Sequence, residues 1–237
     1  AYPSTVLMTA VPARVAGVPE IVVCTPPQVN PLTLVALNIA GVEEAYQIGG
    51  AQAIAAMALG TETIRPVEKI VGPGNVFVTK AKMMLREYAE IDFPAGPSEI
   101  GIIADDAANP AFIAADVLAQ AEHDPNAACV LVTDSVALAA AVGEEIAVQI
   151  SASPRRDIME KALSHSGYVI AEDLDNAVSL MNRISPEHLS IQTTDPLTTF
   201  SGIRHAGSIF IGPYTPVACG DYASGTNHVL PTAGYAK

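Results

Sequence analysis

The amino-acid sequence predicts an α/β protein with mainly parallel sheets, built from two related domains. Apolar runs of strand length alternate with helical patterns almost throughout, which favours βαβ units and parallel pairing. Half of the residues are hydrophobic, only 16% are charged and no Trp is present. We therefore expect a core of Ala, Val, Ile and Leu, as is typical of sheets covered by helices.

The first half of the chain follows a helix, strand, helix, strand order. Pro26-Pro27 ends the first strand, Gly49-Gly50 opens a helix, and the turn Gly72-Pro73-Gly74-Asn75 precedes the last one. The expected helices are residues 4–16, 31–40, 51–59 and the stretch from that turn to about residue 88, and the expected strands are residues 20–24, 45–48 and 67–71.

The second half repeats this progression. Pro110 stands well at the first turn of a helix. The expected strands are residues 99–104, 128–133, 168–171, 189–192 and 208–211, and the expected helices are residues 110–122, 135–150 and 174–184. Strand 208–211 is predicted to close the regular structure. We place the first domain in residues 1–98 and the second in residues 99–237.

Charge and composition exclude several classes of function. The formal net charge of −13 argues against a nucleic-acid surface, which needs clustered Lys and Arg. No stretch approaches the roughly 18 apolar residues that span a bilayer, so we expect a soluble, cytoplasmic protein. Cys24, Cys129 and Cys219 are far apart and lack CxxC spacing, which argues against a disulfide framework or a cysteine zinc site. We expect Cys219 in a polar loop, as a non-catalytic thiol.

Two pairs of side chains have chemical content. Glu187 and His188 follow a proline between a predicted helix and a predicted strand, where a carboxylate beside an imidazole suits proton transfer. The alternative is a solvated loop pair. Gln120 and His123 lie three residues apart at a predicted helix end, so both side chains emerge on one face and can hold one ion. The alternative is that His123 caps the helix while Gln120 is solvated.

Glycine-rich segments form the remaining candidates. Residues 218–228 combine Gly, Ser, Thr and Asn with Asp, Tyr and His, which suits either ligand binding or an ordinary surface loop. Gly49-Gly50 and the turn at residues 72–75 open helices and expose amides that suit a dinucleotide phosphate, although neither is a GxGxxG fingerprint and turn geometry alone also explains the glycines. Gly96-Pro97-Ser98 supplies a third small-residue turn, with a hydroxyl that could face a cleft between the domains.

Six segments, in order along nearly the whole chain, together resemble the histidinol dehydrogenase family. They are Gly49-Gly50-Ala51-Gln52-Ala53, Gly72-Pro73-Gly74-Asn75, Pro94-Ala95-Gly96-Pro97-Ser98-Glu99, Gln120-Ala121-Glu122-His123, Pro186-Glu187-His188-Leu189 and residues 220–231. Unlike a lone glycine motif, an ordered set of this kind is highly specific, and it favours the functional interpretation of each segment.

The resemblance implies an activity, two cofactors and a set of site residues. The family oxidises L-histidinol to L-histidine in two NAD-dependent steps and uses zinc. By resemblance, Gln120, His123 and Asp221 would be the zinc ligands in this sequence, and Glu187 and His188 would be the acid/base pair. The same resemblance implies that the substrate is contacted by Ser98, Gln120, His123, His188, Asp221 and His228. It also implies that Gln52 and Asn75 contact NAD.

The same resemblance implies a pair of Rossmann-like domains, of aldehyde dehydrogenase-like architecture, in an intertwined homodimer. Family members extend further at both ends, with a cofactor-contacting Tyr upstream and a Glu and a fourth zinc-ligating His downstream. We therefore expect an incomplete zinc site and little or no turnover from this chain alone. Two alternatives stay open: a related zinc-dependent dehydrogenase acting on another alcohol, and a non-catalytic binding core.

Overall fold

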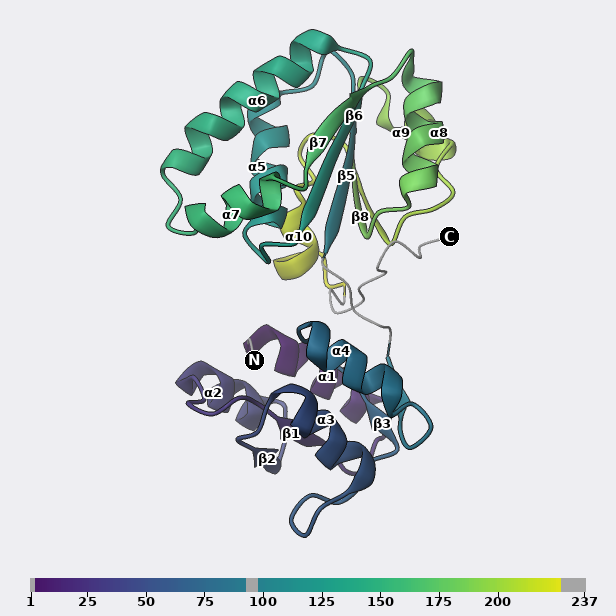
Figure 1. Cartoon of the computed structure of the whole chain (residues 1–237). Coiled ribbons are helices and arrows are strands. Elements are labelled where there is room, and N and C mark those ends of the chain that lie inside the picture. The colour runs from purple at the N-terminus through teal and green to yellow at the C-terminus, as the bar shows by residue number, and fades with distance from the viewer. Residues whose placement is uncertain (1–2, 93–97, 227–237) are drawn as a thin grey trace. The chain divides into compact units, whose positions relative to one another are not determined.

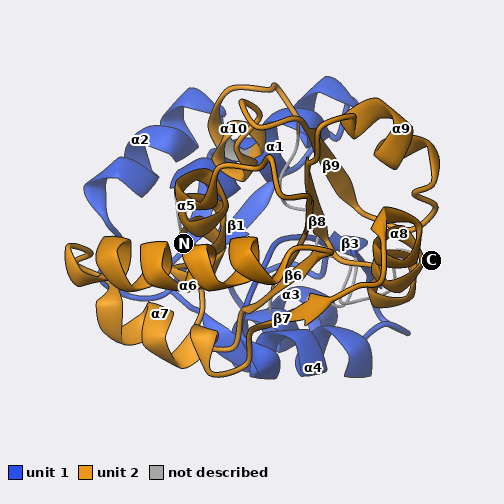
Figure 2. Cartoon of the chain, turned by 90° about the horizontal axis from the view of Figure 1, so that it is seen from above, with its two compact units in different colours: residues 1–96, 227–230 blue, residues 97–226, 231–237 orange. Residues whose placement is uncertain are grey.

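The computed structural model describes residues 3–92 and 98–226, apart from the Asp221 side chain. The chain divides into two compact units, coloured separately in Figure 2. The first contains described residues 3–92. The second contains described residues 98–226, so that Ser98 belongs to the second unit. All strand pairs among the described residues are parallel, and the predicted α/β class with parallel sheets is confirmed.

The second unit is organised around one five-stranded parallel sheet. The strands are β5 (Glu99–Ala104), β6 (Ala128–Thr133), β7 (Gly167–Ile170), β8 (His188–Gln192) and β9 (Ser208–Ile211). Their spatial order is β7-β6-β5-β8-β9. The chain therefore runs outward from β5 to one edge, returns to the centre and continues to the other edge, which is the strand order of a doubly wound Rossmann-like sheet.

Helices cover both faces of this sheet, as Figure 1 shows. One layer contains α5 (Pro110–Ala121), α6 (Val136–Ser151) and α7 (Arg156–Leu163), and the other contains α8 (Leu174–Ile184) and α9 (Pro196–Ser201). A short last helix, α10 (Val217–Tyr222), packs against α5. The core has two parts, one on each face: Ile100, Ile102, Ile113 and Leu131 lie in the first, and Ile103, Met181, Leu189 and Ile191 in the second.

The first unit is built from shorter elements. Its helices are α1 (Pro3–Val15), α2 (Pro31–Ile39), α3 (Gly50–Leu59) and α4 (Val76–Met84), and its strands are β1 (Val22–Cys24), β2 (Glu44–Tyr46), β3 (Lys69–Ile70) and β4 (Glu90–Ile91). β1 pairs with β2 and β3 with β4, so the described residues form two small sheets. Each has its own apolar cluster, one around Ala36 and Leu37 and one around Ile54 and Ile70.

Local sequence signals account for most helix starts. Asn30, Asn75, Asn109, Ser135, Asp173 and Asp195 each accept a backbone hydrogen bond at the start of the following helix. Pro also occupies the first turn of α2, α5 and α9. Side chains of this kind satisfy backbone N–H groups that have no partner inside the helix.

The structure corrects the predicted elements in five places. The prediction that regular structure ends at residue 211 is wrong, because α10 follows, and α7, α9 and β4 were not predicted. These elements have two to eight residues, too few for a hydrophobic period to register in the sequence. The predicted strand 67–71 is reduced to Lys69–Ile70.

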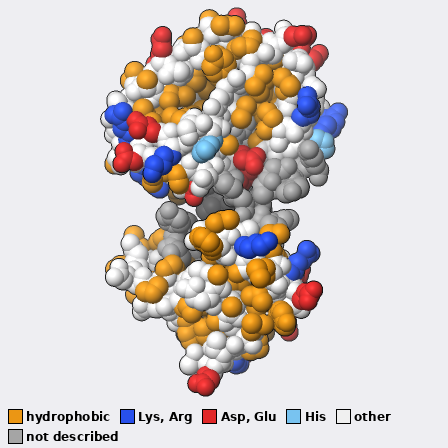
Figure 3. Space-filling view, viewed as in Figure 1, with side chains coloured by type: hydrophobic (Ala, Val, Ile, Leu, Met, Phe, Trp, Pro, Cys, Tyr) orange, Lys and Arg blue, Asp and Glu red, His pale blue; other side chains and the backbone are white. Residues whose placement is uncertain are grey.

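Several large apolar side chains lie on the surface of the first unit. Figure 3 shows hydrophobic side chains gathered over α3 and α4, and the exposed large residues of α4 are Val76, Phe77, Met83 and Met84. Apolar clusters of this kind are typical of surfaces that become covered in an assembly. Within residues 3–92 and 98–226, none of the helices has the length and apolar character needed to cross a bilayer.

Candidate functional site

The predicted site residues of the second unit gather at the amino ends of the sheet strands. Ser98 directly precedes β5, and His188 is the first residue of β8, where it pairs with Ile100. The Ser98 carbonyl accepts a hydrogen bond from the Ala128 N–H at 3.3 Å, which ties it to the start of β6. Open α/β sheets usually bind ligands at the carboxyl ends of their strands, near the point where the strand order reverses. Here the predicted residues lie at the opposite edge.

The backbone that presents Glu187 and His188 is tightly constrained. Ser185 ends α8 in the left-handed conformation, with φ 55°, although it is not a glycine. Its hydroxyl donates to the Asn182 carbonyl at 2.9 Å, which stabilises this turn. The next residue, Pro186, is fully buried, and the carbonyls of Pro186 and Glu187 accept hydrogen bonds from Gly207 N–H and Ser208 N–H at 3.1 and 2.8 Å. Strained backbone of this kind persists where surrounding contacts over-determine it, and it is common at functional sites.

Glu187 is buried, with 5% of its surface exposed. A solvated loop pair would expose both side chains, so that alternative is wrong for Glu187. A carboxylate removed from bulk water is costly unless other groups compensate it, and such positions are enriched among functional residues.

The His188 imidazole is held between an amide and an aromatic ring. His188 Nδ1 lies 2.9 Å from Gln120 Oε1, and the ring makes an edge contact with Phe210, with centroids 5.9 Å apart at 64°. Because an amide oxygen only accepts, this contact requires a proton on Nδ1 and makes Nε2 the nitrogen that can take up a proton in the neutral ring. The arrangement suits a base.

Gln120 is also buried, with 2% of its surface exposed, so the alternative of a solvated Gln120 is wrong. Its Nε2 has no hydrogen-bond partner among the described residues. Buried polar atoms without partners are rare in folded proteins, and a bound water or ligand often satisfies them. Gln120 therefore holds its Oε1 against His188 and leaves an N–H donor at Nε2 available beside it.

His123 follows α5 and is exposed, and its backbone N–H bonds to the Gln120 carbonyl at 3.2 Å. Asp221 lies on α10, but its side chain is outside the described part of the chain, as is all of His228. Within the described residues there is no group of three or more His, Cys, Asp and Glu side chains that could hold a metal. This absence does not test the predicted zinc ligands, because Gln120 is an amide and the Asp221 side chain lies outside the described residues.

A buried polar network that the sequence analysis missed connects α5 to β8 and α10. Asp116, 4% exposed, accepts hydrogen bonds from Ser190 Oγ at 3.2 Å and Gln192 Nε2 at 3.1 Å through Oδ2. Its Oδ1 accepts from Val217 N–H at 3.0 Å. Burial raises the pKa of the Asp116 carboxyl, and the three hydrogen bonds oppose that shift. The signal in the sequence was spacing: Asp116 lies one helical turn before Gln120, and Ser190 and Gln192 follow His188 at alternate positions.

Helix α10 replaces the loop predicted for residues 218–222. Gly220 lies directly against the Phe210 ring. A Cβ atom at this position would approach Phe210 Cζ to 2.8 Å, so a larger residue would not fit without a shift. Cys219 is therefore a half-buried helical residue and not part of a polar loop. Phe210 contacts both α10 and the His188 ring, which brings α10 to the same edge of the sheet as the catalytic candidates.

The predicted cofactor residues lie in the first unit. Gln52 is exposed on α3, and its side chain folds back over Gly50, whose φ is 74°. Asn75 begins α4, and its Oδ1 accepts from Phe77 N–H and Val78 N–H, both at 3.1 Å. Asn75 therefore has a structural role as a helix cap, in addition to any contact with a ligand.

The turn before Asn75 is held by a buried ion pair. Lys82, 3% exposed, pairs with Asp92 and donates to the Gly72 carbonyl at 3.0 Å. Asp92 Oδ2 also accepts from Gly72 N–H at 2.7 Å. These contacts order a glycine turn at a helix N-terminus, where exposed amides suit an anion. Sequence reasoning missed both residues, because Lys82 lies ten residues from Gly72 and from Asp92, and Asp92 lies twenty residues from Gly72.

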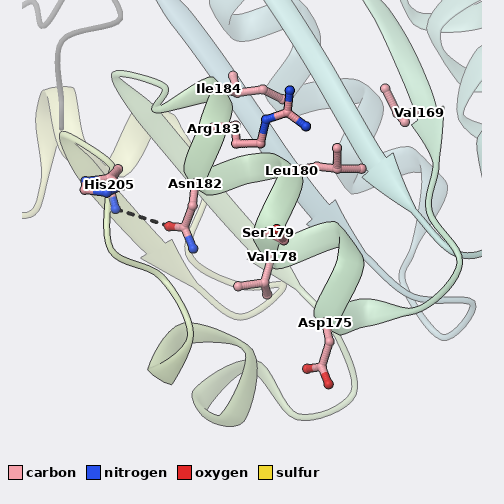
Figure 4. A pocket seen from close by; sticks show the side chains of 9 residues that line it. All are labelled: Val169, Asp175, Val178, Ser179, Leu180, Asn182, Arg183, Ile184 and His205. Carbon is pink, nitrogen blue, oxygen red and sulfur yellow. Dashed lines mark hydrogen bonds between the residues drawn. The ribbon is translucent and has the colours of Figure 1, made fainter.

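An open hollow on the second unit contains none of these residues. Figure 4 shows it along α8, where Asn182 Oδ1 accepts from His205 N–H at 3.2 Å. It is lined by Val169, Asp175, Val178, Ser179, Leu180, Asn182, Arg183, Ile184 and His205. Helix α8 covers the sheet face opposite α5, so this hollow is separate from the candidate site.

Comparison with known proteins agrees with the motifs. The sequence model of histidinol dehydrogenase matches residues 1–237. The histidinol dehydrogenase of Methanosarcina mazei is 57% identical over 240 residues, which cover 100% of this chain and 55% of that protein. That of Methanothermobacter thermautotrophicus is 57% identical over 241 residues, with 100% and 57% covered. The chain thus spans about half the length of the curated relatives it matches.

A solved structure agrees with the fold. The crystal structure of histidinol dehydrogenase from Elizabethkingia anophelis superposes with a TM-score of 0.95 at 42% sequence identity. The match covers 99% of this chain and 55% of that one.

Proposed function

Because this chain belongs to the histidinol dehydrogenase family, we propose that it carries the proton-transfer and metal-binding residues for NAD-dependent oxidation of L-histidinol to L-histidine. The observation that carries the proposal is the contact between His188 Nδ1 and Gln120 Oε1, beside the buried Glu187. It orients an imidazole as a base next to a carboxylate, at the edge where Ser98 also lies.

His188 is the base of both oxidation steps. In the first, His188 Nε2 takes the proton of the substrate hydroxyl as the carbinol carbon is oxidised to the aldehyde, histidinal. In the second, water adds to the aldehyde, and His188, having released the first proton, takes a proton of the hydrate as it is oxidised to the carboxylic acid. NAD would supply the hydride acceptor for each oxidation. The hydrogen bond to Gln120 supports this role because it keeps the ring in the tautomer that accepts at Nε2.

Glu187 activates the water of the second step. It is adjacent to His188 and 5% exposed, so its carboxylate is shielded from bulk solvent. A buried carboxylate can remove a proton from a bound water more effectively than a fully hydrated one. No covalent cysteine intermediate is needed, and Cys129 supports this because it is buried and burial raises its pKa to about 11.

Zinc would be held by Gln120, His123 and Asp221. Amide oxygen, imidazole and carboxylate groups are chemically suitable ligands, and the buried Gln120 Oε1, which accepts from His188 Nδ1, has a second lone pair that suits a metal. Helices α5 and α10, which carry Gln120 and Asp221, are linked by the bond between Asp116 and Val217 N–H. When bound, the metal would fix the imidazole and amine of the substrate, because a d¹⁰ ion has no redox role.

Four further assignments are part of the proposal. Ser98 and His228 would contact the substrate, together with the three metal ligands and His188. Gln52 and Asn75 would contact NAD, whose role is to accept the two hydrides. The protein would act in the cytoplasm, away from membranes and nucleic acids. It would form a homodimer, which the exposed apolar residues of α4 support.

The test is calorimetric titration of L-histidinol into this chain, with and without zinc. We expect zinc-dependent binding that His123→Ala abolishes. His165→Ala removes an exposed histidine elsewhere on the same unit and should leave binding unchanged. If histidinol bound equally well without zinc, or if both variants behaved alike, the proposed site would be wrong.

A second experiment separates this proposal from its alternatives. NADH formation is measured in a longer polypeptide that contains this chain, with histidinol and with simple 1,2-diols, before and after His188→Asn and Glu187→Gln. A related dehydrogenase would prefer another alcohol. A non-catalytic binding core would bind zinc in all variants and show no turnover that depends on either residue.

A further inference from the structure

The contact between α5 and β8 contains a narrow polar stripe in an otherwise apolar interface. Asp116 and Gln120 lie one helical turn apart on α5, and His188, Ser190 and Gln192 alternate along β8. Their neighbours on the same helix face, Ile113 and Val117, belong to the apolar core. A buried carboxylate here is expensive in free energy, and an apolar residue of similar shape would pack the interface more simply.

The direction of the Asp116 carboxylate accounts for its presence. Oδ2 accepts from Ser190 and Gln192, but Oδ1 accepts from Val217 N–H, 101 residues away in sequence. Val217 is the first residue of α10, and the preceding Pro216 makes no side-chain cap bond. Proline has no side-chain acceptor, so the helix cannot cap itself at this position. Asp116 supplies the missing cap from another helix.

We propose that Asp116 is a positioning residue that fixes the N-terminus of α10, and with it Asp221, relative to Gln120. Asp116 and Gln120 share one rigid helix, so α5 provides one proposed ligand directly and anchors the helix that carries a second. Packing of Gly220 on Phe210 guides α10 from the other side. The role of Asp221 in this inference rests on the proposed function. The anchoring of α10 by Asp116 does not depend on that function.

Three thiols at different depths allow a direct test of the anchor. Cys219 lies on α10 and is half-buried, whereas Cys129 lies in β6 of the same unit and is 2% exposed. Alkylation by iodoacetamide, resolved by site with mass spectrometry, reports release of α10 through Cys219 and unfolding of the whole unit through Cys129. Cys24, in the first unit, gives a reference for reagent activity.

Asp116→Leu removes the cap with little change in side-chain shape, and Ser190 and Gln192 can still bond to each other, as they do at 3.2 Å. We expect Cys219 to react about tenfold faster, in line with the loss of one helix cap, while Cys129 stays protected. Asp116→Asn keeps an oxygen for Val217 N–H, and its NH₂ group can donate to the partnerless Gln192 Oε1 once the Gln192 amide rotates by half a turn, so it should react like the wild type.

Two controls separate anchoring from general core stability. Ser190→Ala removes another bond to Asp116 but keeps the cap, so Cys219 should stay protected. Asp105→Ala removes a buried aspartate at the carboxyl end of β5, where Asp105 accepts from Thr194 N–H at 2.5 Å. It should not release α10. If either control accelerated Cys219 as much as Asp116→Leu does, the anchoring role would be overturned.

A restored cap provides the reciprocal test. Pro216→Ser places a hydroxyl at the cap position of α10 and should return Cys219 protection to the Asp116→Leu protein. If Asp116→Leu unfolded the unit, Cys129 would react as well, and Val217→Pro, which removes the N–H that Asp116 accepts from, would then decide. Cys219 should react faster in that variant while Cys129 stays protected, and an unchanged Cys219 rate would refute the anchor. An unchanged Cys219 rate in a folded Asp116→Leu protein would refute the proposal.

Zinc affinity gives the readout for Asp221. Calorimetric titration of zinc alone should show about tenfold weaker binding for Asp116→Leu and nearly unchanged binding for Asp116→Asn. If Asp116→Leu released α10 but bound zinc as tightly as the wild type, α10 would not position a zinc ligand. The proposed positioning of Asp221 would then be overturned. If the wild type itself bound no zinc, the proposed metal site would fail, and the alkylation experiment alone would decide the anchor.

Discussion

The two faces of β8 are both largely buried but chemically opposite. Leu189 and Ile191 face α8, have 0% exposed surface and pack with Met181 and Ala177. His188, Ser190 and Gln192 face α5 and make hydrogen bonds to Gln120 and Asp116. One strand thus carries a packing face and a functional face. The difference teaches that burial alone does not distinguish a core position from a site position in this unit.

The polar face is tolerated because α5 matches it. Side chains alternate along β8 with a period of two, and Asp116 and Gln120 are spaced by one helical turn, so each polar group of the strand meets a polar group of the helix. On the other face, α8 offers apolar side chains at the same spacing. Each face therefore depends on a different helix, and the two can be altered separately.

The largest effect is expected from substitution of His188, on the polar face of β8. In a polypeptide that contains this chain and oxidises histidinol, His188→Ala should lower kcat by about 10²- to 10⁴-fold, the usual contribution of a general base. Its thermal unfolding should change little, because His188 is only half-buried. Stopped NADH assays and thermal denaturation measure the two quantities. Unchanged kcat would remove His188 from the mechanism.

Leu189→Ala tests the packing face. Removal of a fully buried leucine side chain should cost about 2–5 kcal/mol in the free energy of unfolding. Urea denaturation measures this cost, and Val136→Ala, at a residue that is 67% exposed, is the matched control with a change below about 0.5 kcal/mol. A cost for Leu189→Ala no larger than for the control would show that this face does not hold the sheet to α8.

Gly101→Ala sharpens the same comparison by adding an atom to the packing face. The new Cβ would meet Met181 Sδ, and it would approach Met181 Cε and Pro186 Cγ to 2.9 Å. Overpacking should destabilise the unit by about 1–3 kcal/mol in urea denaturation. Gly143→Ala on α6, where nothing lies within 4 Å, should instead be neutral or stabilising. Equal effects at both glycines would contradict the close approach of α8 to β5.

Substitution of Glu99 is expected to have the smallest effect on stability. It tests a carboxylate on the sheet face that packs against α8. Glu99 alternates with Gly101 and Ile103 on β5, and burial raises its pKa. A folded-state pKa above the unfolded value means that the folded protein loses relative stability as pH rises from about 4 through the folded pKa. Glu99→Gln should therefore gain stability relative to the wild type between pH 4 and pH 7, by less than about 0.5 kcal/mol, because the group is half exposed.

Urea denaturation at both pH values measures the Glu99 difference. Glu144→Gln, on the exposed surface of α6, controls for the loss of one negative charge. A larger advantage of Glu99→Gln at pH 4 than at pH 7 would have the wrong sign and would show that burial does not dominate this carboxyl.

Much of the fold follows from the sequence alone. Alternating strand-length and helical patterns predicted parallel α/β units, and Pro110 marked the start of α5. These signals are readable because hydrophobic period and capping depend on residues within a few positions of one another. The same local reading identified Gln120, Glu187 and His188 as candidates, but it assigned α10 to a loop, because Pro216 offers no local cap.

Only the tertiary structure decided which of these residues meet. Gln120 and His188 are 68 residues apart and contact each other because β8 inserts beside β5 with His188 opposite Ile100. Asp116 reaches Val217 across 101 residues for the same reason, through the packing of α5 on the sheet. Contacts of this kind depend on strand register and helix packing between distant segments, and no short stretch of sequence encodes them. The local residues determined what chemistry is available, and the sheet determined that it gathers at the amino ends of the strands.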